Sequence, residues 1–255
     1  MTVTGERVST SAGGFNPTWQ RHRAAYLAAA DLLPDGRVLD LGCGTGHSFE
    51  LLAPRETVGV DLDASALRCQ RRTTVVADMR ELPFPADTFA AAVSVQAIEH
   101  VPDPERVLTE VARVLEPDGA AVFVTPNRLT FARADEIIDP YHFVEYDAGQ
   151  LRALCERFFQ SVEMRGLFGS ERYLALVAEE RAKLDALLRL DPLRLRRLVP
   201  RRARQRLYDR RLRAERGDDD PHAAEIDISD FTLEPAPLDR SLDLVAVCRG
   251  VPRRA

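Results

Sequence analysis

Three glycines at every second position follow a short apolar segment, in the run VLDLGCGTG from Val38 to Gly46. Glycine lets the backbone turn sharply and lets a ligand approach it closely. The helix expected after this loop offers free N–H groups to an anionic group such as a carboxylate. The motif therefore predicts a strand over 37–41 that ends at a ligand-binding loop. The alternative is a tight turn without a ligand, because bare glycine patterns also occur without function.

Apolar runs and amphipathic runs alternate after this loop. Strands are expected over 57–61, 73–77, 89–95 and 120–125, around 160–165 and over 242–248, and helices over 17–33, 47–53 and 64–71, from 103 to 115 and from 147. Asp103 and Pro104 suit the start of the fourth of these helices, and Pro117-Asp118-Gly119 suits the turn after it. Such alternation indicates a parallel sheet with helices on both faces, so we predict an α/β fold.

The chain length sets the domain organisation. A chain of 255 residues with 45% apolar side chains suffices for one α/β domain with an elaboration. We expect an N-terminal helical arm or lid over 1–36 and the main domain over 37–255. The alternation stops near 165, so 170–220 is predicted as a helical, arginine-rich insertion before the last strand. Trp19 and Tyr26 in the arm are expected to pack in the core, and covering a pocket is the alternative.

The predicted insertion is basic although the chain is acidic. Segment 170–216 holds fourteen arginines and Lys183 against seven acidic residues, whereas the whole chain has a formal net charge of -5. A solvated helical face, a cap for an acidic substrate, and a surface for membrane or nucleic acid are three explanations. The acidic chain and the lack of interleaved aromatic residues disfavour nucleic acid. Peripheral contact with an acidic surface is assigned to 189–216.

Aspartates lie at or just after the ends of three of the predicted strands. Asp61 ends the strand over 57–61, and its carboxylate can accept both hydroxyl protons of a ribose. Asp78 follows 73–77 and can accept a hydrogen bond from an adenine amino group, with Met79 against the ring. Asp40, in the first strand, can balance an ammonium group. Ligands bind beyond the carboxyl ends of parallel strands, which favours these roles over a helix cap for Asp61 and a turn for Asp78.

Taken in order, these motifs resemble the class I S-adenosylmethionine-dependent methyltransferases of the type 11 group. The resemblance rests on VLDLGCGTG, VGVDLD, ADMRELPFPADTF, AIEHVPDPERVLTEVARVLEPDGA and VFVTPN, between Val38 and Asn127. It implies a Rossmann-like, mostly parallel sheet of seven strands with the last one antiparallel, and S-adenosyl-L-methionine as the cofactor. One departure is Ala90, where many relatives carry an aspartate, and it affects the local hydrogen bonding there.

The resemblance also assigns site residues. It gives cofactor binding to Gly42, Gly44, Gly46 and Asp61, the adenine region to Asp78 and Met79, and the methionine moiety to Gln96. Asp40, and Cys43 and Leu62 beside these positions, complete the predicted cofactor site. A nicotinamide dinucleotide site is disfavoured, because its signature is G-x-G-x-x-G whereas this loop reads G-x-G-x-G.

Two histidines are candidates for catalysis. Methyl transfer from a sulfonium depends on aligning the reactants, which can be worth roughly 7 to 11 kcal/mol, and a hydroxyl nucleophile also needs a base. His100 follows the strand over 89–95, and His142 follows the strand over 120–125. One of them is predicted to be the base, and a structural role is the alternative for each. The other three histidines are scattered, and no metal site is predicted.

We therefore predict a methyltransferase acting on an oxygen of a small-molecule, lipid-linked or sugar-linked acceptor. The alternative is a catalytically inactive nucleoside-binding module that acts as a partner or regulator. The polar N-terminal residues carry no secretory signal, and no apolar run approaches the ~18 residues needed to cross a bilayer. The cysteines Cys43, Cys69, Cys155 and Cys248 are widely spaced, as in proteins of a reducing compartment, so a cytoplasmic location is expected.

Overall fold

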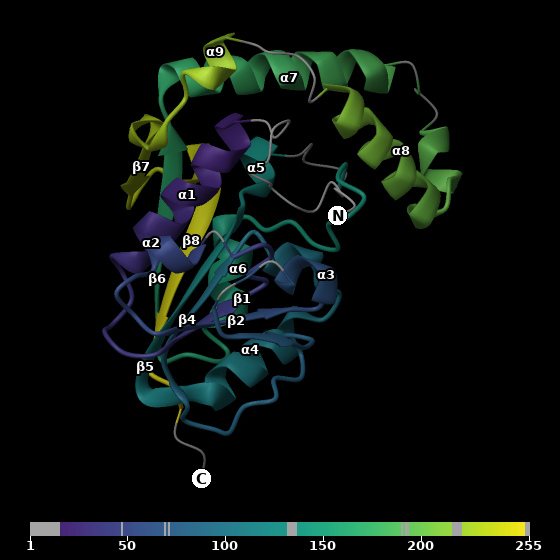
Figure 1. Ribbon diagram of the computed structural model, residues 1–255. Coiled ribbons are helices and arrows are strands. Elements are labelled where there is room, and N and C mark those ends of the chain that lie inside the picture. The colour runs from purple at the N-terminus through teal and green to yellow at the C-terminus, as the bar shows by residue number, and fades with distance from the viewer. Residues whose placement is uncertain are drawn as a thin grey trace.

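A single twisted sheet forms the centre of the protein, seen in a computed structural model (Figure 1). The structure describes residues 16–46, 48–68, 70, 72–131, 137–189, 191, 194–215 and 221–252. Its strands are β1 (Val38–Leu41), β2 (Thr57–Asp61), β3 (Thr74–Val76), β4 (Phe89–Val95), β5 (Leu115–Pro126), β6 (Ser161–Gly169), β7 (Phe231–Glu234) and β8 (Asp243–Arg249). Their order is β3-β2-β1-β4-β5-β8-β6-β7.

Most of the neighbouring strands run parallel. The pairs from β3 to β5 are parallel, and β8 lies antiparallel between β5 and β6. This confirms the predicted mostly parallel sheet with an antiparallel last strand. The parallel order brings the carboxyl ends of β1, β2 and β4 to one edge, where a ligand site is expected.

The predicted count of seven strands is wrong by one, since the described residues form eight. The extra strand, β7, pairs antiparallel with Gly166–Gly169 at the end of β6, which runs beyond the predicted limit near 165. A four-residue edge strand is too short to give a clear period-two pattern, which is why the sequence did not reveal it. The predicted turn at 117–119 also lies inside β5, which pairs with β4 through an irregular register.

The helices are α1 (Asn16–Ala30), α2 (Ser48–Leu51), α3 (Ala64–Leu67), α4 (Pro104–Val114), α5 (Arg128–Phe131), α6 (Ala148–Cys155), α7 (Glu171–Arg189), α8 (Arg201–Glu215) and α9 (Pro221–Ala224). Short 3-10 turns include η1 (Ile98–His100) and η2 (Leu195–Leu198). Asp103 caps α4 as expected, and Asp147 and Gln150 form the capping box that starts α6. The caps explain why these helices begin where the sequence predicts.

Both faces of the sheet are covered by helices. Phe123 of β5 belongs to the hydrophobic cluster under α4 and α6, and its neighbour Val124 belongs to the cluster under α1. Alternate residues of a strand point to opposite faces, so one apolar strand serves two cores. The fold is therefore the predicted doubly covered α/β sheet.

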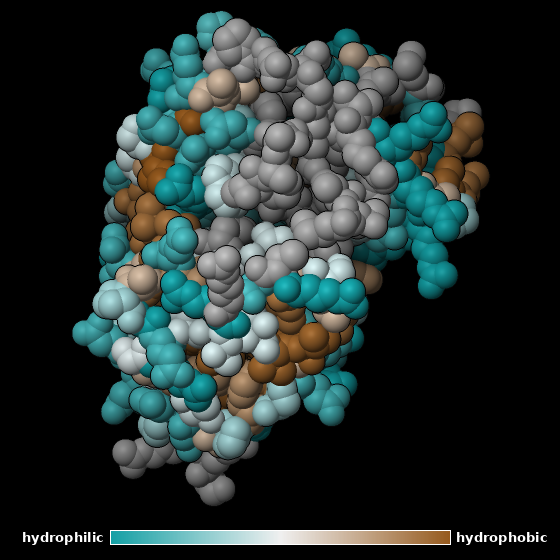
Figure 2. Space-filling model, in the orientation of Figure 1, coloured by the Kyte–Doolittle hydropathy of each residue, from teal (hydrophilic) through white to brown (hydrophobic). Residues whose placement is uncertain are grey.

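The arginine-rich segment forms the helices α7 and α8 and the turn η2 between them, which together are called the arginine-rich arm. In Figure 1, α7 lies along the top of the molecule and α8 runs down beside it, outside the layers of the sheet. Leu195, Leu198 and Leu207 of this arm are exposed, and Figure 2 shows brown side chains at its outer end. Among the described residues, no helix combines the length and the apolar composition needed to cross a bilayer.

Candidate functional site

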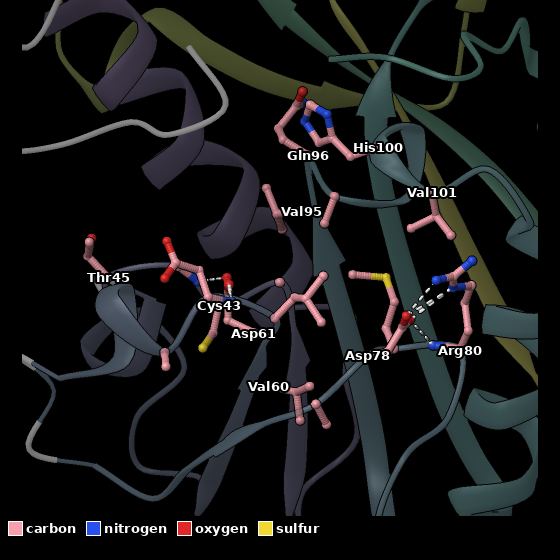
Figure 3. Close-up of a pocket in the computed structure, with 18 of the residues that line it drawn as sticks. Cys43, Thr45, Val60, Asp61, Asp78, Arg80, Val95, Gln96, His100 and Val101 are labelled. Atoms are coloured by element: carbon pink, nitrogen blue, oxygen red, sulfur yellow. Dashed lines mark hydrogen bonds and ion pairs between the residues drawn. The ribbon is translucent and has the colours of Figure 1, made fainter. Parts of the chain in front are cut away.

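An open-sided cavity of about 740 Å³ lies at the carboxyl ends of the central strands (Figure 3). Eight of the ten predicted cofactor-site residues line it: Gly42, Cys43, Gly44, Asp61, Leu62, Asp78, Met79 and Gln96. Asp40 and Gly46 are not among its lining residues. The volume is in the range of small-molecule and cofactor sites, so the cavity is large enough for one nucleoside-sized ligand.

The glycine loop requires glycine for two different reasons. Gly42, Gly44 and Gly46 all have positive φ angles, of 72°, 53° and 82°. A Cβ atom on Gly42 would lie 2.6 Å from the Cβ of Ala97, whereas a Cβ atom on Gly44 would meet nothing within 4 Å. Gly42 is therefore needed for packing against the chain, and Gly44 leaves open space where a ligand can approach the backbone.

Asp61 connects this loop to the end of β2. Its Oδ2 accepts a hydrogen bond from the N–H of Gly44 at 2.9 Å, and its Oδ1 accepts one from the N–H of Asp63 at 2.8 Å. A carboxylate has about four lone-pair positions, so acceptor capacity remains for two ribose hydroxyls. Asp63, not Asp61, caps α3 through the N–H of Ser65, which removes the alternative role considered for Asp61.

Asp78 has a partner that the sequence did not predict. Its carboxylate accepts hydrogen bonds from the guanidinium and the N–H of Arg80, at distances between 2.6 and 3.1 Å. The hydrogen bonds from Arg80 lower the pKa of Asp78. Figure 3 shows this pair on one side of the cavity, with Gln96 and His100 elsewhere on its wall. An adenine amino group would share Asp78 with Arg80.

Asp40 does not lie where direct contact with an ammonium group requires it. The side chain is fully buried, and its carboxylate accepts hydrogen bonds from the hydroxyls of Tyr26 and Ser48. Burial raises the pKa of Asp40 to about 7, against the lowering effect of these two hydrogen bonds. The sequence placed Asp40 at a strand end, but Leu41 lies between it and the loop, and side chains alternate between faces. Asp40 thus connects α1 and α2 through the hydroxyls of Tyr26 and Ser48.

Gln96 is held by a buried polar cluster. It has a positive φ of 53° directly after β4, and its Nε2 donates to Asp243 Oδ1 at 2.7 Å. Asp243 is fully buried and also accepts from Nε of Arg21 in α1, at 2.8 Å. A positive φ at a residue other than glycine is strained and persists only where the surrounding structure holds it in place. Such strained residues occur at functional sites. The cluster fixes Gln96 at the cavity wall.

The two candidate catalytic histidines lie together. His100 lines the cavity, and its ring centroid is 5.0 Å from that of His142, which is buried behind it and is not part of the lining. His100 Nδ1 lies 3.3 Å from the carbonyl oxygen of Tyr141, and His142 Nδ1 lies 2.9 Å from Oε1 of Glu145. A carbonyl only accepts, so in the neutral imidazole this contact favours the tautomer with the proton on Nδ1 and the lone pair on Nε2.

Buried carboxylates surround this pair. Glu99 is 1% exposed, and burial raises its pKa although the charges of His100 and His142 oppose this. Burial alone would lower the pKa of His142, but the hydrogen bond with Glu145 and the charges of Asp139 and Glu99 raise it overall. The sequence identified both histidines, but it gave no signal that Glu99 and Glu145 would join them.

Other residues of the cavity wall were not predicted as site residues. His22 of α1 lines the cavity, and burial lowers its pKa to about 4, so this imidazole is neutral at physiological pH. Tyr26 lines the cavity while its side chain is buried, which combines the two roles considered for it. Periodicity placed both residues on an N-terminal helix, but only the packing of α1 on the sheet brings them here.

The arginine-rich arm reaches the rim of the cavity. The guanidinium carbon of Arg201 lies 3.6 Å from the ring centroid of Phe143, which lines the cavity. Arg201 also donates hydrogen bonds to the carbonyl oxygens of Pro140 and Tyr141, at 2.8 and 2.9 Å. The arm therefore contacts the loop that carries His142. Of the cysteines, Cys43, Cys155 and Cys248 are free and buried, and Cys69 lies outside the described residues.

The cavity fits the cofactor implied by the sequence. The open space at Gly44 admits a ligand to the backbone, Asp61 provides acceptors at the end of β2, and Leu62 and Met79 add apolar contacts. These features suit the ribose and the adenine ring of an adenosine bound at the carboxyl ends of the strands.

Comparisons with known proteins agree with this cofactor. Residues 39–123 match the model of the methyltransferase domain family. A Mycolicibacterium smegmatis protein named as a probable S-adenosylmethionine-dependent methyltransferase is 30% identical, over 97% of this chain and 94% of its own length. A Mycobacterium tuberculosis protein with the same description is 35% identical over 68% of this chain, and the match spans 66% of that relative, slightly under two thirds of its length.

Solved structures agree on the fold. An S-adenosylmethionine-dependent methyltransferase from Thermotoga maritima superposes with a TM-score of 0.59, at 19% identity over 90% of both chains. The [4+2]-cyclase SpnF gives a TM-score of 0.55, at 19% identity over 91% of this chain and 82% of its own. The chain belongs to the S-adenosylmethionine-dependent methyltransferases, and the cofactor of this family is S-adenosyl-L-methionine.

Proposed function

We propose that this protein transfers the methyl group of S-adenosyl-L-methionine to a hydroxyl oxygen of a small-molecule, lipid-linked or sugar-linked acceptor. The observation that carries the proposal is the position of His100, which lines the cofactor cavity and has His142 and two buried carboxylates behind it. A hydroxyl is a poor nucleophile until it loses its proton, and imidazole is the side chain best suited to promote that loss.

The names of two partial relatives support an oxygen acceptor. A ubiquinone biosynthesis O-methyltransferase of Hahella chejuensis is 34% identical over 42% of this chain. A fatty-acid O-methyltransferase of Mycolicibacterium smegmatis is 37% identical over 32% of this chain. Both names give oxygen as the methylated atom, which agrees with the oxygen acceptor proposed for this protein.

In the proposed reaction, some residues of this chain orient the ligand and others promote loss of the acceptor's hydroxyl proton. When bound, the cofactor supplies an electrophilic methyl group on a sulfonium. The Asp61 carboxylate and the open space beside Gly44 position the ligand, while Gln96, held by Asp243, forms the wall between β4 and η1. The histidine pair of His100 and His142 promotes removal of the acceptor's hydroxyl proton. Orientation and deprotonation are the two contributions that methyl transfer to a hydroxyl requires.

The first experiment is calorimetric titration of the full chain with S-adenosyl-L-methionine, its demethylated product and NAD. Binding of the first two ligands and not of NAD is expected. Radiolabelled methyl transfer is then measured on a panel of sugars, hydroxy fatty acids and phenols, with His100→Asn beside the control His222→Asn, a histidine that is exposed on α9. Loss of a base lowers rates by about 10² to 10⁴-fold, so only His100→Asn should show such a loss.

Three outcomes would contradict the proposal. Binding of NAD alone would exclude the methyltransferase site. Transfer to amines but not to hydroxyls would replace oxygen by nitrogen as the acceptor atom. Tight binding of both cofactor forms without transfer to any acceptor class would favour the alternative function, a nucleoside-binding partner or regulator.

A further inference from the structure

We propose that Glu99, His100 and His142 form a binding site for a divalent transition-metal ion beside the cofactor cavity. Each residue offers one ligand atom, and the three atoms lie within 4.8 Å of one another. Zinc bonds of about 2.0 to 2.2 Å place tetrahedral ligand atoms about 3.3 Å apart, so small side-chain rotations suffice to close the site. Two of the three residues are buried, and His100 is partly exposed toward the cavity.

The carboxylate of Glu99 gives independent evidence for a ligand. Its Oε2 accepts a hydrogen bond from Oγ1 of Thr125 at 3.0 Å. Its Oε1 is buried and has no hydrogen-bond partner within the part of the chain that the structure describes. A buried carboxylate oxygen without a partner is costly, and coordination of a cation is one way in which proteins satisfy it. The Glu99 carboxylate belongs to the same cluster as both imidazoles.

The outer contacts of both histidines match those of metal ligands. Nδ1 of His100 faces the carbonyl oxygen of Tyr141, and Nδ1 of His142 faces the carboxylate of Glu145. Histidines that bind metals usually donate their other ring N–H to a carbonyl or a carboxylate, which fixes the tautomer and the ring orientation. These contacts leave Nε2 of both residues for coordination, and Nε2 of His142 also lies 4.0 Å from Oδ2 of Asp139, another carboxylate beside the cluster.

The ligand set selects the class of metal. Two imidazoles and one carboxylate suit Zn²⁺ and other first-row transition ions, and three-ligand sites of this kind keep positions open for water or substrate. Mg²⁺ prefers oxygen ligands and is disfavoured. Because His100 faces the cavity, an open position there can hold a hydroxyl oxygen of the acceptor and favour its ionised form, with the proton released to water.

This role of the ion rests on the proposed function. The ion specifies how the histidine pair acts on the hydroxyl, through coordination rather than through a proton accepted directly by imidazole. Binding of the ion itself does not depend on methyl transfer. It can therefore be measured on the protein without any acceptor.

The test is titration of the chelator-treated full chain with ZnCl₂ and, separately, with MgCl₂, combined with metal analysis of the protein as purified. One Zn²⁺ per chain is expected, and Mg²⁺ should bind far more weakly. Glu99→Gln and His142→Asn should each weaken Zn²⁺ binding by at least about 100-fold, because a lost ligand costs more than a lost outer contact. His22→Asn is the matched control, a histidine of the same cavity outside the cluster. Circular dichroism verifies the fold of each variant.

Specific outcomes would overturn the inference. Absence of Zn²⁺ binding, unchanged binding in Glu99→Gln and His142→Asn, or an equal loss in His22→Asn would each do so. If Glu99→Gln fails to fold, His142→Asn and His100→Asn provide the same comparison. Titration of the metal-free protein with S-adenosyl-L-methionine separates the two proposals: without Zn²⁺ binding, retained cofactor binding leaves the methyltransferase function standing and removes only the metal site.

Discussion

The N–H of Gly44 donates a hydrogen bond to Oδ2 of Asp61 over 2.9 Å and so joins the loop after β1 to the end of β2. The residues are 17 positions apart in the chain. The contact orients the Asp61 carboxylate along the cavity wall before any ligand binds. A carboxylate that is already oriented increases ligand affinity, because less side-chain entropy is lost when the ligand binds.

Asp61→Ala should therefore weaken binding of S-adenosyl-L-methionine by about 10 to 100-fold, the loss expected for one hydrogen bond to a charged group. Isothermal titration calorimetry measures the change. Asp103→Asn is the control, since this residue caps α4 and is not among the residues that line the cavity. Equal affinity in the wild-type protein and Asp61→Ala would show that the ribose contact is wrongly assigned.

Replacing Gly42 should mainly lower stability, whereas replacing Gly44 should mainly weaken cofactor binding. Gly42→Ala should lower the free energy of unfolding by about 3 kcal/mol, because it combines a positive φ with a steric clash against Ala97. Gly44→Ala should cost only about 1 to 2 kcal/mol of stability but should weaken cofactor binding, because its methyl group would project into open space at the cavity. Denaturant unfolding and calorimetry separate the two effects.

Gly149→Ala in α6 is the matched control for these variants. Gly149 has an ordinary φ and lies in a helix, where alanine is favoured over glycine by about 1 kcal/mol. This variant should gain stability and bind the cofactor normally. A similar loss of stability in all three variants would show that the loop conformation has no special role.

Asp40 predicts the pH dependence of stability. Its pKa is about 7 in the folded protein and 3.8 in an unfolded chain, so the folded state holds a proton between these values that the unfolded state lacks. The contribution of the Asp40 proton to the free energy of unfolding is full below pH 3.8, and it is lost as pH rises through the folded-state pKa of about 7. Relative to Asp40→Asn, the wild-type protein should lose about 2 to 3 kcal/mol between pH 5 and 8.

Thermal unfolding of both proteins at pH 5, 6, 7 and 8 measures this difference. Asparagine keeps a group of the same shape for Tyr26 and Ser48 but does not titrate, so the variant's midpoint should depend less on pH. Parallel curves for the two proteins across this range would mean that Asp40 stays charged, or stays neutral, throughout.

Arg201 should control the mobility of the loop that carries His142. Its contact with Phe143 and its hydrogen bonds to Pro140 and Tyr141 attach that loop to α8. Arg201→Ala should speed amide hydrogen exchange over 139–146 by about tenfold, the effect of losing about 1 to 2 kcal/mol of local stability. Arg202→Ala, at the exposed neighbouring position, should leave the exchange unchanged. Equal exchange in both variants would show that the arm does not support the loop.

We propose that the exposed side of α8 contacts an anionic phospholipid membrane. Arg202, Arg206 and Arg210 follow one another at every fourth position and are exposed, beside the exposed Leu198 and Leu207. Basic residues near an anionic bilayer contribute about 1 kcal/mol each, so replacing the three arginines by glutamine should weaken binding to phosphatidylserine vesicles by about 100-fold. Vesicle co-sedimentation at two salt concentrations measures this.

A matched triple replacement of Arg23, Arg37 and Arg240, which lie outside α8, is the control for net charge. Vesicles of pure phosphatidylcholine should not bind the wild-type protein. Equal losses in both triple variants, binding to RNA instead of vesicles, or self-association that depends on the same arginines would each contradict a membrane contact.

The sequence alone determined the class of fold and most of the cofactor side of the cavity. The glycine loop, Asp61 and Asp78 follow strands, and parallel strands bring their carboxyl ends to one edge whatever the details of packing. For the same reason, eight of the ten predicted cofactor residues line one cavity. Local patterns suffice here because each contact follows from the strand that precedes it.

Only the tertiary structure decided the rest. Glu99, His100 and His142 meet because the segment after β5 folds back over η1, and no local pattern encodes a contact between segments about forty residues apart. The burial of Asp40, the contact of Arg201 with Phe143 and the pairing of β7 with β6 likewise depend on how separate elements pack. Periodicity fixes which face of an element is apolar, but the partner of each polar side chain is set by the packing of the whole chain.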